Sequence, residues 1–195
     1  MSMTDEPAPT STSRDPAPGA LEVVRQFVNT HDYEDGAEQF PTPAALREWL
    51  SANGLLADDE PVSDADLART IEVREALRAL CLANNGEPLD SAALDALNSA
   101  ARMSPVQIRF GPDGNAMELA PAGAGVPAAL ASILAIVHAA MADGSWERLK
   151  VCPAHDCLWA FYDRSRNRSG HWCSMAVCGN RAKARSYRER RRRDD

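Results

Sequence analysis

The chain has 195 residues and a mass of 21.1 kDa, enough for one ordinary domain and a small additional module. Its 45% hydrophobic and 25% charged residues are typical of a globular protein and exclude collagen-like, mucin-like and wholly disordered chains. The formal charge of −7 hides an asymmetry: residues 1–145 hold 8 basic and 22 acidic side chains, a net charge of −14, whereas residues 146–195 hold 13 and 6, a net charge of +7. Such a division favours two modules, one of which binds a polyanion.

The N-terminal sequence predicts neither export nor membrane insertion. Residues 1–19 are rich in proline and small polar residues, which cannot bury enough apolar surface to fold, so we expect a disordered leader there. No basic segment followed by an apolar core opens the chain, so we expect a cytoplasmic protein. The longest apolar stretch, residues 128–142, is shorter than the roughly 20 residues that span a bilayer and predicts a buried core helix, with no membrane partner.

Residues 20–145 predict a mainly helical domain with one β-hairpin. Apolar residues recur at helical spacing in five segments, and two of these segments begin with clear capping signals, Thr42-Pro43 and Ser63 with Asp66. Strict alternation of apolar and polar residues flanks the turn at residues 111–115 and predicts the hairpin. The expected helices cover residues 20–28, Thr42-Pro43 to Asn53-Gly54, 63–83, 91–101 and 127–142, and the expected strands cover residues 106–110 and 117–119.

Four of the five cysteines form two close pairs, Cys152 with Cys157 and Cys173 with Cys178, separated by 15 residues. Two close pairs joined by a loop supply the four thiolates of a tetrahedral zinc site. Two disulfides are the alternative, but thiols persist in the reducing compartment expected here. We therefore predict one Zn²⁺, and a closed set of four thiolates leaves no position for substrate, so its role is structural.

The segment around these cysteines predicts a small finger over residues 146–195. Residues 158–162 are expected to form a strand, residues 164–170 an exposed turn, and residues 171–172 a returning strand. A strongly basic helix follows Cys178. The predicted fold class is therefore a mainly α domain with a β-hairpin, followed by a small C-terminal zinc finger of treble-clef-like order.

Because the second cysteine pair ends in Cys178-Gly179-Asn180-Arg181, the C-terminal quarter of the chain resembles the CGNR zinc finger, and residues 20–145, with Phe27-Val28-Asn29-Thr30 near their start, are similar to the helical ABATE domain that usually precedes it. The motif that opens the ABATE-like part is Phe27-Val28-Asn29-Thr30. The resemblance implies a bacterial transcription regulator induced by stress. The finger motifs are Cys152, Cys157, Trp159, Phe161-Tyr162-Asp163, Ser165-Arg166-Asn167-Arg168, Trp172-Cys173-Ser174-Met175 and Cys178-Gly179-Asn180-Arg181-Ala182-Lys183.

The basic C-terminal segment is the predicted nucleic-acid contact. It has too few apolar residues to be held by packing alone, and arginine suits both phosphates and guanine edges. Neutralising about six phosphates would give a slope of log K against log salt of roughly −5. The predicted contacts are Arg181, Lys183, Arg185, Arg188, Arg190, Arg191, Arg192 and Arg193, with a second row at Arg164, Arg166 and Arg168.

Two arginines, Arg74 and Arg78, fall on the apolar side of the helix predicted at residues 63–83. A buried guanidinium needs an anionic or carbonyl partner. One hypothesis is an internal ion pair, for instance with Asp32 or Glu34. The other is a small anionic effector held by Arg74 together with Asn29.

No catalytic motif is recognisable in the sequence, and we predict that the chain is not an enzyme. Duplex DNA is the favoured partner, because a module this small needs its aromatic residues as a core rather than as platforms for unpaired bases. An RNA-binding factor and a protein-interaction module with an autoinhibitory acidic domain are the alternatives. A second copy of the chain is a further candidate partner.

Overall fold

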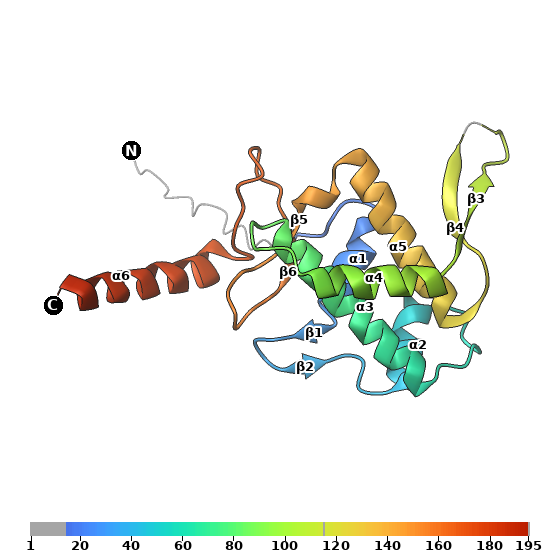
Figure 1. The fold of residues 1–195 in the computed structure, drawn as a ribbon, viewed down its shortest axis with the longest axis horizontal. Helices are drawn as coiled ribbons and strands as arrows, with labels where there is room; N and C mark the ends of the chain where they lie inside the picture. The colour runs from blue at the N-terminus through green and yellow to red at the C-terminus, as the bar shows by residue number, and fades with distance from the viewer. Residues whose placement is uncertain (1–14, 115, 195) are drawn as a thin grey trace, which may run out of the picture.

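The computed structural model describes residues 15–114 and 116–194, which form a helical body from which the C-terminal helix projects (Figure 1). The helices are α1 (Leu21–Val28), α2 (Pro43–Ala52), α3 (Asp64–Ala83), α4 (Ser91–Met103), α5 (Gly125–Asp143) and α6 (Asn180–Asp194). The strands are β1 (His31–Asp32), β2 (Ala37–Glu38), β3 (Val106–Phe110), β4 (Met117–Pro121), β5 (Leu149–Val151) and β6 (Ala160–Tyr162). Short helical turns lie at Trp146–Arg148 and Met175–Gly179. The predicted fold class, mainly helical with small hairpins and a C-terminal zinc finger, is confirmed.

The helices of the body begin where the capping signals predict. The Thr42 hydroxyl accepts a hydrogen bond from the Ala45 amide, and Pro43 occupies the first turn of α2. At α3, the Ser63 hydroxyl accepts from the Asp66 amide while the Asp66 carboxylate accepts from the Ser63 amide, which completes a capping box. These local hydrogen bonds explain why the two helix starts were predictable.

Helices α1, α3 and α5 pack together and supply most of the core. Phe27, Leu77, Leu130 and Ile133 are fully buried where these helices meet. Helix α5 begins at Gly125, two residues before the predicted start. Its middle lies in the core as predicted, and by length and composition alone it is also apolar enough to cross a membrane.

The three two-stranded sheets match the sequence only in part. The pairing of β3 with β4 confirms the predicted hairpin. The pairing of β1 with β2 was not predicted, because strands of two residues show no alternation. The prediction for residues 158–162 was wrong in its partner: β6 pairs with β5, which precedes the first cysteine, while residues 171–172 form no strand.

The hydrophobic core continues past residue 145, where the sequence suggested a boundary between modules. Trp146, Leu149, Val151 and Ala160 belong to the same buried cluster as the helical body. A second, smaller cluster surrounds the four cysteines. The hairpin β5–β6 therefore lies between the two clusters and contributes side chains to both.

The predicted leader lies mostly outside the described residues, which begin at Asp15. Of its described residues, Ala17 is packed against the body and the others are exposed. Ala17 is 5% exposed, and its amide donates to a Glu22 carboxylate oxygen at 2.6 Å. Contact with the helical body thus begins before residue 20.

Candidate metal centre and nucleic-acid interface

Cys152, Cys157, Cys173 and Cys178 lie together and are all buried. Their Sγ atoms are all within 4.8 Å of one another. Cys173 Sγ lies 3.4 Å from Cys157 Sγ and 3.7 Å from Cys178 Sγ. No disulfide joins these residues, and Cys81 is also a free thiol. The alternative pairing into disulfides is therefore not found in the part of the chain that the structure describes.

The arrangement fits a tetrahedral zinc ion. With Zn–S bonds of about 2.3 Å, the sulfur atoms of such a site are about 3.8 Å apart, close to the separations found here. Hydrogen bonds among the thiols lower the pKa of Cys152 and raise the pKa of Cys157 and Cys173, because neighbouring thiols share protons when one of them ionises. One structural zinc site, as predicted, is consistent with these four cysteines.

Tight turns bring each cysteine pair together. The Cys157 amide donates to the Ala154 carbonyl at 2.8 Å, and Leu158 then takes a positive φ of 47° that turns the chain into β6. The Cys152 amide donates to the Trp159 carbonyl, which closes the first turn. The second pair spans the π-helical turn at Met175–Gly179, which leads directly into α6.

The remaining cysteine and the two histidines of this region lie outside the cluster. Cys81 is fully buried, and burial raises the pKa of its thiol, so it remains protonated. The His155 side chain is 86% exposed beside Asp156. His171 Nδ1 lies 3.0 Å from the Asn85 side-chain oxygen. None of them is grouped with the four thiols.

A buried ion pair fixes the loop between the two cysteine pairs. Lys150 Nζ lies 2.8 Å from an Asp163 oxygen and also donates to the carbonyls of Arg168 and Gly170. The Asp163 carboxylate accepts from the amides of Ser165 and Gly170. Burial alone would raise the pKa of Asp163, but the hydrogen bonds from Lys150 and Ser165 lower it to about 2. The loop is thus held at both ends by one carboxylate and one ammonium group.

The predicted nucleic-acid residues after Cys178 lie on α6, which projects from the body (Figure 1). Arg181 and Arg185 are half-buried, and the following basic side chains are exposed as far as they are described. Lys183, Arg188, Arg190, Arg191 and Arg192 are exposed, and the side chain of Arg193 lies outside the described set.

Arg181 differs from the rest of the row because it faces the protein. Its guanidinium contacts Glu34 Oε1 at 3.0 Å and Asp156 Oδ2 at 3.5 Å, and it donates to Cys178 Sγ at 3.3 Å. Of the side chains described on α6, Arg181 is the one that forms an ion pair with the helical body. The geometry therefore ties the first turn of α6 both to the body and to the cysteine cluster.

The second predicted row lies on the loop that Asp163 holds. Arg164, Arg166 and Arg168 are exposed. The Arg164 guanidinium lies over the Tyr162 ring at 5.7 Å and donates to the Pro16 carbonyl, and Arg168 pairs with Glu147. Two of the three arginines thus already have protein partners.

The predicted effector residues, Arg74 and Asn29, are both partnered within the protein. Arg74 is 2% exposed and forms two 2.7 Å hydrogen bonds with the Glu38 carboxylate and one of 2.8 Å with Glu75. The hypothesis of an internal ion pair is thus confirmed for Arg74, but the partners suggested for it, Asp32 and Glu34, were wrong. The Asn29 amide group donates to the Ala160 carbonyl and accepts from the Ala160 amide.

A set of polar residues, of which the sequence singled out only Arg78, joins α3 and the turn after it to the finger. Arg78 donates to the carbonyls of Val28 and Leu158. Asn84 donates to the carbonyls of Trp146 and Leu149, and Asn85 donates to those of Val151 and His171. Asn84 and Asn85 come directly after the helix predicted at residues 63–83, and the apolar residues Leu149 and Val151 were the available signal for the strand they contact.

The aromatic residues of the finger serve mainly as packing. Phe161 is 1% exposed and packs with the cysteines, as do Trp159 and Trp172 in part. Tyr162 packs against the core of the body. This matches the expectation that a small module uses its aromatic residues as a core.

Two family descriptions match the chain. The CGNR zinc finger matches residues 148–191. ABATE, described as a putative stress-induced transcription regulator, matches residues 12–144. Neither description is that of an enzyme family. A search of curated proteins found no match.

Proposed function

The chain belongs to the ABATE family and carries a CGNR zinc finger, and from this premise we propose that it is a cytoplasmic bacterial regulator that binds duplex DNA through its C-terminal helix. The zinc site is structural in this proposal, with Cys152, Cys157, Cys173 and Cys178 as its ligands. The helical body receives a signal or associates with a partner.

The observation that carries the proposal is the placement of α6. The helix is rich in arginine, continues directly from the last cysteine of the metal centre, and extends away from the body (Figure 1). Fifteen residues of helix span about 22 Å, enough to follow a groove of duplex DNA for about half a turn. A basic helix without an apolar stripe gains stability when a polyanion neutralises its repelling charges.

The negative charge of the body favours an orientation in which α6, and not the body, approaches the polyanion. Residues 1–145 carry a net charge of −14, so the body is repelled by the phosphates that attract α6. Arg181, held by Glu34 and Asp156, sets the direction in which the helix leaves the body. We propose that Arg181 orients α6 and that the exposed Lys183, Arg188, Arg190, Arg191 and Arg192 contact the DNA, together with Arg193 and in part Arg185.

The test is selection of bound sequences from a random duplex pool by the full-length, zinc-loaded protein. We expect enrichment of a sequence, weaker binding as salt increases, and loss of binding after a chelator removes the zinc. Absence of salt-dependent duplex binding by protein with one equivalent of zinc would overturn the proposal. If structured or single-stranded RNA competes better than the selected duplex, the partner is RNA and not DNA.

A further inference from the structure

The hairpin β3–β4 has one face made wholly of apolar side chains. The register pairs Val106 with Pro121, Ile108 with Leu119 and Phe110 with Met117, so all six side chains lie on the same face. The alternate positions carry the polar pair Arg109 and Glu118. The apolar side chains are not covered: the exposed fractions are 43% for Val106, 59% for Ile108, 67% for Phe110 and 64% for Met117.

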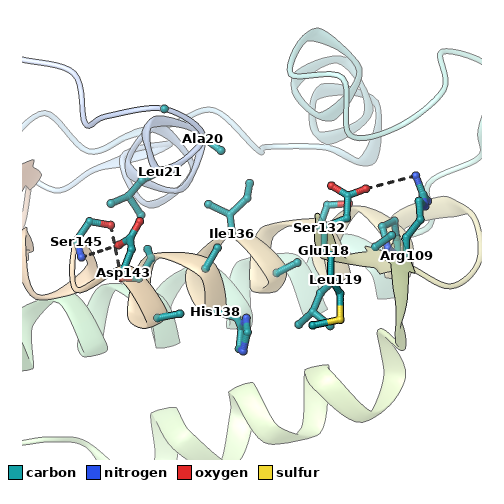
Figure 2. A pocket seen from close by; sticks show the side chains of 18 of the residues that line it. Ala20, Leu21, Arg109, Glu118, Leu119, Ser132, Ile136, His138, Asp143 and Ser145 are labelled. Carbon is teal, nitrogen blue, oxygen red and sulfur yellow. Dashed lines mark hydrogen bonds and ion pairs between the residues drawn. The ribbon is translucent and has the colours of Figure 1, made fainter. Parts of the chain in front are cut away.

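A groove of about 1130 Å³ lies beside this hairpin and runs along α5. Figure 2 shows Ser132 and Ile136 on α5, with Leu119 and Glu118 of the hairpin at one end and Leu21 of α1 at the other. Small residues such as Ala135 and Ala139 complete the wall on the side of α5. Such a surface allows another protein element to approach α5 closely.

The charged groups that border this groove are already paired locally. Arg109 Nη1 lies 3.7 Å from Glu118 Oε1, and the Asp143 carboxylate accepts from the Ser145 amide at 2.8 Å (Figure 2). Helix α5 has no charged residue before Asp143, yet only 39% of its most apolar window is buried. The groove is lined both by Ile108, Met117 and Leu119 of the hairpin's apolar face and by exposed residues of α5, so the two apolar surfaces adjoin in one patch.

We propose that this patch is the interface between two copies of the chain. Each copy presents a projecting apolar hairpin and, next to it, an apolar groove. A two-fold axis would let the hairpin of each copy enter the groove of the other, so that both features are covered at once. The net charge of −14 in residues 1–145 disfavours an anionic membrane as the partner of this face.

The size of the patch is compatible with a small dimer interface. Its exposed side chains offer on the order of 500 Å² per copy, so the pair would bury about 1,000 Å², the lower limit of a specific interface. Interfaces at this limit are typical of reversible association, so the dimer is tested across a range of concentrations. The inference does not depend on nucleic-acid binding, so it can fail or succeed independently of the proposed function.

Sedimentation equilibrium of the zinc-loaded, full-length protein across the micromolar range tests the proposal. We expect a reversible dimer that Phe110→Glu weakens at least tenfold, because the substitution places a charge on the apolar face of the hairpin. Gln107→Glu is the matched control: it adds the same charge to the opposite face of the same strand and should leave the dimer intact. The exposed position of Phe110 predicts unchanged far-UV circular dichroism and an unchanged melting temperature.

A second variant tests whether Phe110→Glu acts merely by disturbing the hairpin of the monomer. Ala139→Arg lies on the exposed side of α5, where arginine is a good helix former, and it should weaken the dimer without altering the monomer. A monomer at every concentration, a dimer that resists both Phe110→Glu and Ala139→Arg, or equal weakening by Gln107→Glu would overturn the proposal. Monomers that bind neutral phosphatidylcholine vesicles through this patch would overturn it in favour of a lipid surface.

Discussion

Single polar side chains replace a missing strand at the junction between the body and the finger. Strand β6 pairs with β5 on one side, and Asn29 from the end of α1 satisfies the Ala160 amide and carbonyl, at 2.7 and 2.9 Å. An asparagine side chain has the same donor and acceptor as a peptide group, so it can complete a ladder where no strand is present. The Phe27-Val28-Asn29-Thr30 motif therefore combines two core residues with this backbone contact.

Replacing Asn29 with alanine should destabilise the protein by about 2–3 kcal/mol, because it leaves a buried amide and a buried carbonyl of Ala160 without partners. Urea unfolding followed by circular dichroism measures the change. Asn167→Ala, in the exposed loop between the cysteine pairs, should change the free energy of unfolding by less than about 0.5 kcal/mol. Equal effects of the two substitutions would show that the Asn29 contacts carry no stability.

The Arg74 ion pair gives a second residue-scale prediction, for Glu38→Gln. The variant should lose about 2 kcal/mol at neutral pH, because the nearly buried Arg74 guanidinium keeps only Glu75 as a charged partner. Burial alone would raise the pKa of Glu38, but hydrogen bonds from Arg74 and the Phe40 amide lower it below the usual 4.5.

The sign of the pH dependence follows from this lowered pKa. The folded protein binds the Glu38 proton less tightly than the unfolded chain does. The contribution of the ionised Glu38 to stability is therefore complete above about pH 4.5 and is lost as the pH falls through the lowered pKa. The difference in stability between the unsubstituted protein and the Glu38→Gln variant should therefore shrink in acid. Both proteins should carry His31→Gln, which removes the imidazole that lies 3.2 Å from Glu38. A difference independent of pH would contradict the assignment.

At the scale of elements, the features predicted correctly from the sequence are those that depend on contacts between residues close together in the chain. The cap at Thr42, the capping box at Ser63 and the hairpin β3–β4 each rest on contacts within a few residues, and each was found. The partner of β6 was not predictable in this way. Pairing β6 with β5 depends on Asn29 and Arg78, which reach it from more than 75 residues away in the chain.

The cysteine cluster was predictable from spacing, whereas the role of Arg181 was not. Four thiols at matched spacing have few arrangements that suit one metal ion, so composition and spacing were sufficient. Arg181 lies at helical spacing from Arg185, Arg188 and Arg192, and its partners Glu34 and Asp156 come from distant segments. Only the tertiary structure separates it from the row.

This difference predicts distinct effects of two arginine variants on DNA binding by the full-length protein. Arg191→Ala should reduce the steepness of the salt dependence by about one, because one phosphate contact is lost. Arg181→Gln should weaken binding by about fivefold with the salt slope unchanged, because it frees the direction of α6 without removing a phosphate contact. Fluorescence anisotropy at several salt concentrations measures both.

The matched control for these variants is Arg102→Ala on α4, which removes the same charge from an exposed position on the acidic body. It should change neither the affinity nor the slope. A reduced slope for Arg181→Gln would instead make Arg181 a direct phosphate contact, as the sequence first suggested.

At the scale of the whole molecule, the division of charge does not follow the division of the core. The net charges of −14 and +7 suggested two modules joined at residue 145, yet Trp146, Leu149 and Val151 complete the core of the helical body. Charge describes the surface, and the buried residues that join the two parts are apolar residues and uncharged amides, with Arg78 as a charged member. The positive charge is concentrated on α6, which leaves the body only after the metal centre.

The shared core predicts that removing zinc will destabilise the helical body as well as the finger. Zinc binding to four thiolates contributes on the order of 10 kcal/mol to folding of such a site. Its loss should release β5 and β6, and with them the backbone partners of Asn84 and Asn85 on α3. We expect a single unfolding transition whose midpoint falls by on the order of 20–40 °C when a chelator is added.

Far-UV circular dichroism is a suitable measurement, because five of the six α-helices described lie before residue 146 and dominate the signal. Cys173→Ser should melt at the lower temperature with or without chelator. Cys81→Ala, which removes the buried thiol outside the metal centre, should keep the response to chelator. Two separate transitions, with the helical one unaffected by zinc, would contradict the prediction, because a core shared through β5 and β6 cannot lose these strands and retain its stability.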